Sequence, residues 1–454
     1  MSRIFWFRKD LRLQDNEALT RCAEAAIADS GSPVFGCFTY QRDTFESLSG
    51  IRQHSLVASL ESLRKSMSDS LHILEGESAA ALVKFAKQND VEFIHATQSY
   101  DPAGMLEQVQ VAKALEAIGK KLVLEGSNYA VAPGAVVKPT DGSAYRVYTP
   151  FYKAWFEIGW PQPFKLPKKT VWGQASDSKI PKPTTPAQFK VRAGEGYALD
   201  TFERFKKRAL FDYSENRNRA DLSGTSKLSH ALAHGEIHPR TLLADLRDIP
   251  GHNVFRKEIA WREFYADVLF RNPHTVNDYY VPRFSKMRYD KGKDAVEKLE
   301  RWKLGTTGFP MVDAGMRQLA AEGWMHNRVR MIVASFLVKD LHLEWQQGAD
   351  WFEQCLSDFD PASNSHGWQW TAGCGTDASP YYRVFNPILQ GYKFDPDGNY
   401  VRKYIPELSH LEGAEVHEPW LLVDGLINGY PEPMLDHSKE RDESLRRLEE
   451  IKEK

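Results

Sequence analysis

The sequence is poor in cysteine and has no long apolar run. Its four cysteines, at positions 22, 37, 355 and 374, show neither the spacing of a metal site nor a disulfide framework. This usage suits a reducing compartment, so we expect a cytoplasmic protein without a bound metal. The run that comes nearest to a membrane helix, residues 332–338, is far shorter than the roughly 20 apolar residues that a span needs. Charged residues from Arg8 to Arg12 also interrupt any secretory signal at the N-terminus.

The sequence also lacks an excess of charge of either sign. It has 59 Lys and Arg against 61 Asp and Glu, which gives a net charge of −2. A nucleic-acid partner would therefore have to bind a local patch. The hydrophobic fraction of 42% and the charged fraction of 26% are typical of soluble globular proteins. A chain of 454 residues is too long for one ordinary core, so we expect two domains.

Residues 1–128 alternate strand-like apolar runs with segments of helical spacing. The apolar runs are 4–7, 34–40, 71–74, 93–96 and 122–124, and the helical segments are 53–67, 78–88 and 105–118. This alternation predicts a doubly wound parallel sheet. No Gly-x-Gly-x-x-Gly follows the first strand, which argues against a nicotinamide dinucleotide domain. For the charged run that does follow it, residues 8–16, we expect a solvated loop with internal ion pairs.

A change of composition separates this α/β part from the rest of the chain. Six prolines between residues 160 and 196, mixed with Lys, Ser and Thr, predict an irregular connector. Beyond it the spacing is helical, most clearly at 256–270, 312–321, 327–341 and 351–355. The charged tail, 438–454, is predicted to be a solvated helix. We therefore expect an α/β domain at 1–128, a linker at 129–196 and an all-α domain at 197–454.

The most unusual stretch runs from Asp358 to Trp370 and reads Asp-Phe-Asp-Pro-Ala-Ser-Asn-Ser-His-Gly-Trp-Gln-Trp. Its content of Pro, Gly, Ser and Asn predicts an irregular loop and not the interior of a helix. The simplest reading of its two indoles is a buried aromatic corner. The chain has 12 tryptophans in all, a number that suggests a role for some of them beyond packing.

Other motifs accompany this stretch in a fixed order. They are Gly-Thr-Ser-Lys-Leu-Ser (224–229), Trp-Arg-Glu-Phe-Tyr (261–265), Gly-Trp-Met-His-Asn-Arg-Val-Arg-Met (323–331) and Ser-Phe-Leu-Val-Lys-Asp-Leu (335–341). Together they resemble the flavin domain of the DNA photolyase/cryptochrome family, and residues 7–13 resemble the opening of that family. The resemblance covers nearly the whole chain and is greatest to the bacterial cyclobutane pyrimidine dimer photolyases. It implies a carbon–carbon lyase that uses light and reduced FAD to split dimers flipped out of damaged DNA.

The resemblance implies which residues hold FAD. Hydroxyl groups and backbone N–H groups at a helix start can bind an anion, although an ordinary helix cap is the simpler reading of residues 224–229. In the family this segment grips the pyrophosphate, and the matching residues are Tyr213, Thr225, Ser226, Lys227, Leu228 and Ser229. Others border the flavin: Arg262, Arg330, Asp358, Asp360 and Asn364. Arg330 is expected to pair with Asp358. Asn364 is expected beside N5, where a neutral amide can accept a hydrogen bond without adding a repelling charge.

The resemblance also implies a lesion pocket. On the predicted helix 256–270, Glu258, Trp261 and Arg262 share one face, and a Glu258–Arg262 ion pair is the simpler alternative. In the family, Trp261 and Trp370 match stacking walls, Glu258 hydrogen-bonds a thymine carbonyl, and Asn327 and Met331 line the pocket. With Asn364, these residues form the expected catalytic set. The (6-4) branch carries two histidines where this chain has Asn327 and Met331, so we expect repair of cyclobutane dimers only.

Two further sets of residues follow from the resemblance. Trp302, Trp345 and Trp368 match the electron-transfer triad, with Trp368 next to the flavin; three packed tryptophans are the alternative. DNA contacts are expected from Glu258, Trp261 and Asn327 and from Arg217, Arg328, Arg383, Gln390 and Lys393.

The sequence does not determine whether the protein binds an antenna pigment, or which pigment it would be. The folate-binding branch has an Asn-Glu pair where this chain reads Asp101-Pro102-Ala103-Gly104. Methenyltetrahydrofolate, a deazaflavin, a second flavin and no pigment all stay possible.

The rival function is a cryptochrome-type blue-light photoreceptor, against which Asn364 and the lesion pocket argue. We expect a monomer.

Overall fold

The computed structural model describes residues 1–175, 178–186, 191–377 and 382–452 of the chain. These residues form two compact units, which we describe separately. The first consists of Met1–Phe211 with Ser226–Pro273, and the second of Asp212–Thr225 with His274–Lys454. Among the described helices, none is both long enough and apolar enough to cross a membrane.

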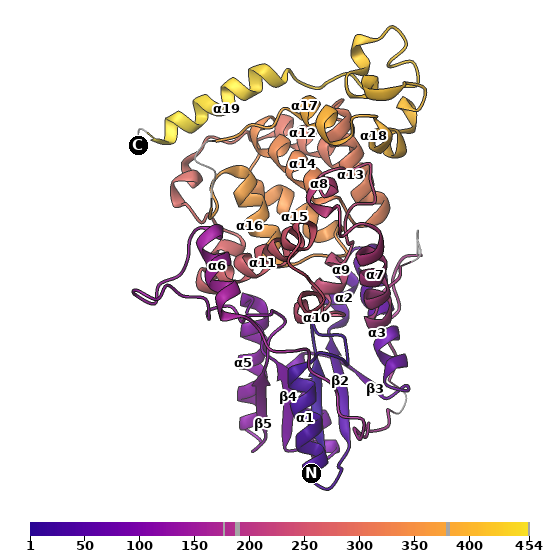
Figure 1. Cartoon of the computed structure of the whole chain (residues 1–454), viewed down its shortest axis with the longest axis vertical. Helices are drawn as coiled ribbons and strands as arrows, with labels where there is room; N and C mark the ends of the chain where they lie inside the picture. Colours follow the sequence, from indigo (N-terminus) through magenta and orange to yellow (C-terminus); the bar gives the residue numbers. More distant parts are fainter. Residues whose placement is uncertain (176–177, 187–190, 378–381, 453–454) are drawn as a thin grey trace. The chain divides into compact units, whose positions relative to one another are not determined.

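The first unit is built on a five-stranded parallel sheet (Figure 1). Its strands are β1 (Arg3–Phe7), β2 (Val34–Tyr40), β3 (Leu71–Glu75), β4 (Phe93–Thr97) and β5 (Lys121–Glu125). They lie in the order β3-β2-β1-β4-β5, so β2 and β3 extend the sheet on one side of β1, and β4 and β5 extend it on the other. All five predicted strands are confirmed.

Alternation along β1 explains how both faces of this sheet are covered. Phe5 and Phe7 pack into one apolar cluster with side chains of α1 (Glu17–Ala28) and α3 (Gly50–Ser66). Ile4 and Trp6 belong to another cluster, with side chains of α4 (Ser78–Gln88) and α5 (Pro102–Glu116). Successive residues of a strand point to opposite faces, so the sheet is doubly wound, as predicted. A short helix, α2, spans Arg42–Ser47.

The charged run after β1 is not the solvated loop that we expected. Asp10, Arg12 and Asp15 are each at most 3% exposed. Arg12 donates to the backbone carbonyl of Gly235, and the Asp15 carboxylate lies 3.1 Å from the guanidinium of Arg240. The prediction that the ion pairs are internal to this segment is also wrong. Lys9 pairs with Asp101 at 3.3 Å, and Asp15 pairs with Arg240. Because these partners are distant in the sequence, the local pattern could not reveal the burial.

The first unit continues with helices that follow the proline-rich segment. They are α7 (Glu195–Arg208), α9 (Ser229–Ala233), α10 (Pro239–Ala244) and α11 (Pro250–Arg271), and α6 (Tyr148–Ile158) precedes that segment. The described part of residues 159–194 contains no helix and no strand apart from an isolated bridge between Trp172 and Val34. This agrees with the irregular connector that the prolines predict.

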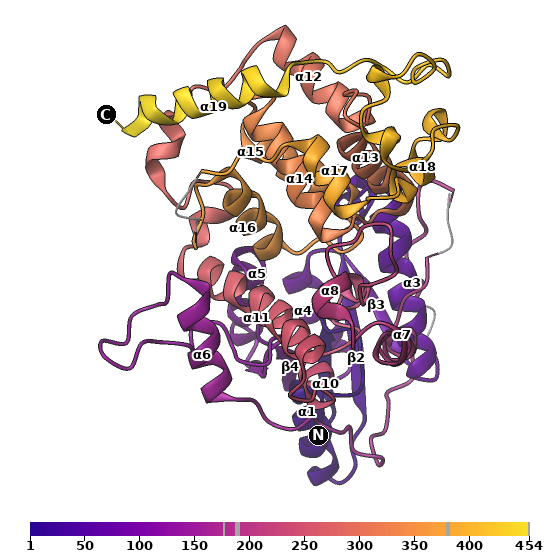
Figure 2. The ribbon, with the colours of Figure 1, turned by 45° about the horizontal axis from the view of Figure 1, so that its top comes forward.

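The second unit is helical in its described part (Figure 2). Its helices are α8 (Tyr213–Asn216), α12 (Lys293–Leu304), α13 (Pro310–Glu322), α14 (Asn327–Lys339), α15 (Trp345–Cys355), α16 (Pro361–Ala372), α17 (Pro387–Phe394), α18 (Asn399–Tyr404) and α19 (His437–Lys452). Short 3-10 turns are η1 (Pro273–Val276), η2 (Pro282–Lys286), η3 (Pro406–Leu408), η4 (Gly413–His417) and η5 (Pro419–Leu421). α14 is the centre of the core, because every residue from Ile332 to Lys339 is buried.

The stretch that we predicted to be a loop contains a helix, α16. Asp360 is its N-cap and accepts a hydrogen bond from the backbone N–H of Ser363 at 2.7 Å, while Pro361 occupies the first turn. Proline at this position and an Asp cap both favour a helix start. Ser, Asn and Gly inside the helix weaken its propensity, but burial of Trp368 and its neighbours compensates.

The C-terminal helix α19 is also less solvated than predicted. Ser444, Arg447, Leu448 and Ile451 are buried on one face. Arg447 pairs with Asp290 at 2.8 Å and with Glu443 at 2.6 Å. The charge pattern predicted the helix, but not that one face packs against the unit.

Candidate functional site

Arg330 and Asp358 form the ion pair that the sequence predicted. Nη2 of Arg330 donates to Oδ2 of Asp358 at 2.7 Å, and Nε donates to the carbonyl of Met325 at 2.9 Å. The Asp358 side chain is fully buried, yet its Oδ1 accepts no hydrogen bond from the described residues. A buried carboxylate oxygen without a donor is costly, so Oδ1 fits the hydrogen-bond donor of a bound ligand.

Asn364, one turn into α16, has a fixed amide orientation. Its Nδ2 donates to the carbonyl oxygen of Ala349 on α15 at 3.0 Å. The amide oxygen consequently stays available as an acceptor. This is the orientation that a neutral group needs to accept a hydrogen bond from a ligand N–H.

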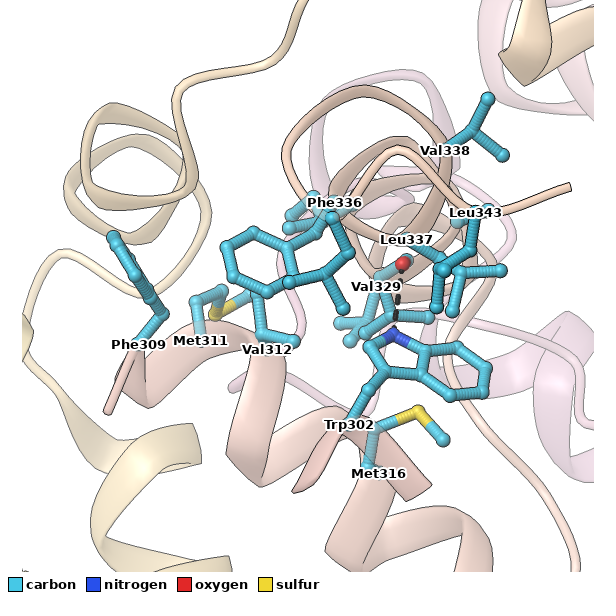
Figure 3. Close-up of a cluster of buried hydrophobic side chains, with 14 of the residues drawn as sticks. Trp302, Phe309, Met311, Val312, Met316, Val329, Phe336, Leu337, Val338 and Leu343 are labelled. Atoms are coloured by element: carbon cyan, nitrogen blue, oxygen red, sulfur yellow. Dashed lines mark hydrogen bonds between the residues drawn. The ribbon is translucent and has the colours of Figure 1, made fainter. Parts of the chain in front are cut away.

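The three predicted relay tryptophans all lie in the core of the second unit. Their exposed fractions are 0% for Trp302, 1% for Trp345 and 3% for Trp368. The rings of Trp302 and Trp368 meet edge to face with centroids 6.1 Å apart. Figure 3 shows the Trp302 indole among apolar side chains, with its N–H donating to the carbonyl of Val333 at 3.0 Å. Trp302 is therefore packed like an ordinary core residue.

Trp345 and Trp368 differ from Trp302 in their polar atoms. Their indole N–H groups are buried and find no acceptor among the described residues. Trp345 meets Tyr279 edge to face, with ring centroids 6.2 Å apart. A relay made only of these three tryptophans would have no solvent-exposed end.

The predicted pocket residues of α14 lie at its first turns. Asn327 is exposed and Met331 is half-buried. His326 is the N-cap: its Nδ1 accepts from the backbone N–H of Arg328 at 3.2 Å. The only histidine of this motif is thus occupied in capping the helix. Trp370, on α16, is half-buried.

The residues predicted to contact DNA in the second unit differ in their surroundings. The Arg328 guanidinium donates twice to Oδ1 of Asn218, at 3.2 and 2.9 Å, and lies 4.5 Å from the ring centre of Phe394. Arg383 and Lys393 are exposed, and Arg217 and Gln390 are half-buried. Arg328 therefore has structural contacts within the protein, and its contact with DNA stays a prediction.

The predicted phosphate segment divides between the units. In the second unit, Tyr213 is buried, Thr225 is half-buried, and a Cβ at Gly224 would lie 2.9 Å from the carbonyl of Asn216. In the first unit, Ser226 Oγ accepts from the N–H of Leu228 at 3.4 Å, Lys227 is exposed with a φ of 53°, and Ser229 opens α9. The tight turn requires glycine at 224.

Helix α11 carries the predicted lesion residues of the first unit. Glu258, Trp261 and Arg262 are all half-buried. The Arg262 guanidinium donates to the carbonyls of Asn128 at 3.2 Å and Leu232 at 3.3 Å, and it lies 4.5 Å from the ring centre of Tyr129. Trp261 stacks on Tyr148, with ring centroids 3.8 Å apart and an interplanar angle of 8°.

Sequence reasoning missed two residues that hold α11. Glu263 is 2% exposed and accepts from the backbone N–H groups of Ala130 and Val131 and from the indole of Trp155. Burial raises the pKa of this carboxyl group. Tyr148 was missed because nothing in the sequence links it to Trp261, 113 positions later. The sequence signal that could have revealed Glu263 is a carboxylate on the apolar side of the predicted helix 256–270.

Comparison with known proteins identifies the family. Residues 3–168 match the DNA photolyase model, and residues 255–450 match the FAD binding domain of DNA photolyase. A deoxyribodipyrimidine photo-lyase of Agrobacterium fabrum is 38% identical over 97% of this chain and 96% of its own length. The chain belongs to the DNA photolyase family. Its helical part therefore includes an FAD-binding domain.

Solved structures of the family share the fold over its full length. A class III photolyase from Agrobacterium tumefaciens has a TM-score of 0.89 and 35% identity, covering 100% of this chain and 98% of that one. A Sulfolobus tokodaii photolyase with two FAD molecules gives 0.85 and 25%, with 99% and 100% covered. A Synechocystis cryptochrome gives 0.87 and 26%, with 98% of each chain covered. The fold alone thus does not separate repair from light sensing.

Proposed function

We propose that this chain repairs cyclobutane pyrimidine dimers in DNA, using light and bound FAD. The observation that carries the proposal is the 38% identity to the Agrobacterium fabrum deoxyribodipyrimidine photo-lyase over nearly the full length of both chains. When bound, FAD in its reduced anionic form supplies the light-driven electron transfer that splits the ring. The side chains then position the cofactor and the lesion.

Two groups in the second unit fit the flavin. The buried Oδ1 of Asp358 fits a ligand N–H, and the hydrogen bond from Arg330 to Oδ2 holds that carboxylate in place. The oxygen of Asn364 fits N5–H of the reduced ring, because Ala349 fixes the other end of the amide. We assign Tyr213, Thr225, Ser226, Lys227, Leu228 and Ser229 to the pyrophosphate and Arg262 and Asp360 to the border of the flavin. Asp360 would do this with its second oxygen, since Oδ1 caps α16.

For the lesion, we assign stacking to Trp261 and Trp370 and hydrogen bonds to Glu258 and Asn327. Met331 provides an apolar wall. Proton transfer to or from a base would require a titratable group such as histidine on α14. Asn327 and Met331 cannot provide it, and His326 is the helix cap. The pocket therefore favours cyclobutane dimers, whose cleavage needs only electron donation and return.

For photoreduction, we assign electron transfer to Trp302, Trp345 and Trp368. The indole N–H groups of Trp345 and Trp368 find no acceptor among the described residues, whereas that of Trp302 donates to the carbonyl of Val333. For DNA binding, we assign phosphate contacts to Arg217, Arg328, Arg383, Gln390 and Lys393. We further propose that the chain is a cytoplasmic monomer, with 1–128 as the antenna domain, 129–196 as the linker and 197–454 as the FAD- and DNA-binding domain.

For the antenna site the alternatives are methenyltetrahydrofolate, a deazaflavin, a second flavin and no pigment. Asp101 caps α5 through the N–H of Gly104 at 3.1 Å and pairs with Lys9 at 3.3 Å. Its carboxylate is thus engaged within the fold. An absorption spectrum of the purified protein would show FAD and any second pigment at once.

The test compares light with darkness. Protein with reduced FAD is incubated with an oligonucleotide that carries one cyclobutane thymine dimer, and the restored thymines are separated chromatographically. We expect repair in blue light and none in the dark. A protein that binds FAD and responds to light but restores no thymine would be a photoreceptor of the cryptochrome type, and the proposal would be wrong.

A further inference from the structure

Tyr148 covers one face of Trp261. The two rings are nearly parallel, at 8°, and their centroids are 3.8 Å apart. The other aromatic neighbours of Trp261 meet it at steep angles: 73° for Phe264 and 52° for Tyr265. Tyr148 is therefore the ring that lies flat against the indole.

Tyr148 is itself held firmly. It is 8% exposed, and its hydroxyl donates to the backbone carbonyl of Lys257, one turn before Trp261, at 2.7 Å. Further along α6, Phe151 packs on Phe264 with centroids 5.0 Å apart, and Trp155 donates to Glu263. Contacts at three successive levels join α6 to α11, so the Tyr148 ring cannot turn away without disturbing both helices.

A side chain that must stack on a base gains from being fixed beforehand. An indole free to rotate loses conformational entropy when it binds, whereas one held in place does not. Trp261 is half-buried, so part of its ring faces solvent while Tyr148 covers one face. The parallel stack and the hydrogen bond from the Tyr148 hydroxyl to Lys257 thus both restrict the orientation of the Trp261 indole.

We propose that Tyr148 is a positioning residue that holds Trp261 in the orientation in which it stacks on a lesion base. This inference rests on the proposed function, specifically on the role of Trp261. It predicts that Tyr148 contributes to the preference for damaged over undamaged DNA. General DNA affinity, which depends on phosphate contacts, should not depend on it.

The experiment measures dissociation constants for one duplex with and without a cyclobutane dimer, in the dark, with FAD-loaded protein. Tyr148→Leu should lower the preference for the damaged duplex by roughly three- to tenfold, the range expected for an aromatic pair. Tyr148→Phe retains the ring and should behave like the parent. The control is Phe156→Leu on the same helix, whose ring meets Trp160 edge to face; it should retain the preference. FAD content and melting temperature verify folding, and Tyr148→Met replaces Tyr148→Leu if the latter does not fold.

A double-mutant cycle separates positioning from general damage to the structure. In a Trp261→Ala background, Tyr148→Leu should cause no further loss of preference, because the side chain that it positions is absent. An unchanged preference in Tyr148→Leu, an equal loss in Phe156→Leu, or a full additional loss in the Trp261→Ala background would each overturn the inference. If the parent protein itself shows neither preference for the dimer nor repair, the proposed function fails first, whatever the Tyr148 variants do.

Discussion

A single hydrogen bond determines whether Asn364 presents a donor or an acceptor to a cofactor. The sequence supplied the residue type and the structure supplies the orientation, since Nδ2 donates to Ala349 and leaves the oxygen available. Asp358 shows the opposite case. Its pairing with Arg330 was implied by the family resemblance and is confirmed. Its buried Oδ1, which finds no donor among the described residues, could be recognised only in three dimensions.

Asn364→Asp tests this orientation. The new carboxylate would place an oxygen where Nδ2 now lies, 3.0 Å from the Ala349 carbonyl, and two acceptors repel at that distance. The carboxyl group must turn away or bind a proton, which raises its pKa above the ordinary value of about 3.9. Where it is ionised, negative charge beside the ring should lower the midpoint potential of bound FAD.

The measurement is a redox titration of bound FAD at several pH values. Asn364→Ala is the control, because it removes the hydrogen bond without adding charge, and its potential should change less. A potential for Asn364→Asp that equals that of the parent at every pH would place Asn364 away from the flavin.

At the scale of elements, α16 was the main error of sequence reasoning. Composition predicted a loop, but Asp360, Pro361 and a buried Trp368 produce a helix. The N-cap signal was present in the sequence and was outweighed by the count of Ser, Asn and Gly. Tertiary packing decides such cases, and the packing partners on α15 are not recognisable from the segment itself.

Asp360→Ala should destabilise the protein by about 1 kcal/mol, because it removes the cap of α16. Asp360→Asn keeps a cap of similar quality and should leave thermal stability nearly unchanged. Both variants lose the charge, so a loss of FAD affinity shared by the two would reflect contact with the flavin. Comparing melting temperature and FAD retention separates these effects. Equal destabilisation of both variants would contradict the capping role.

At the scale of the whole molecule, alternation of short apolar runs predicted the five strands and their parallel sheet, and helical spacing predicted the main helices of the second unit. The burial of Asp10, Arg12 and Asp15 was not predictable. Arg12 and Asp15 depend on Gly235 and Arg240, which approach them only after folding. The same limit applies to Tyr148 and Trp261. Local patterns specify elements, whereas long-range polar contacts specify which charges are buried.

Overall charge does not predict DNA binding here, since the net charge is only −2. Binding should therefore depend on particular cations. Lys393→Ala should weaken binding to damaged and undamaged duplex alike and reduce the salt slope by about one phosphate contact. Lys84→Ala, which removes another exposed lysine, on α4, is the control and should change neither. The readout is affinity as a function of salt. An unaltered slope for Lys393→Ala would remove this residue from the DNA surface.

Repair of cyclobutane dimers without acid–base catalysis can be tested with a pair of lesions. Reduced, FAD-loaded protein is illuminated with two oligonucleotides of the same sequence, one carrying a cyclobutane dimer and the other a (6-4) photoproduct. Restored bases are then quantified chromatographically. Asn327 and Met331 offer no proton-transfer group, and His326 caps α14. We predict complete repair of the cyclobutane substrate and none of the (6-4) substrate. Turnover of the (6-4) photoproduct, or failure to restore the cyclobutane dimer, would contradict the account.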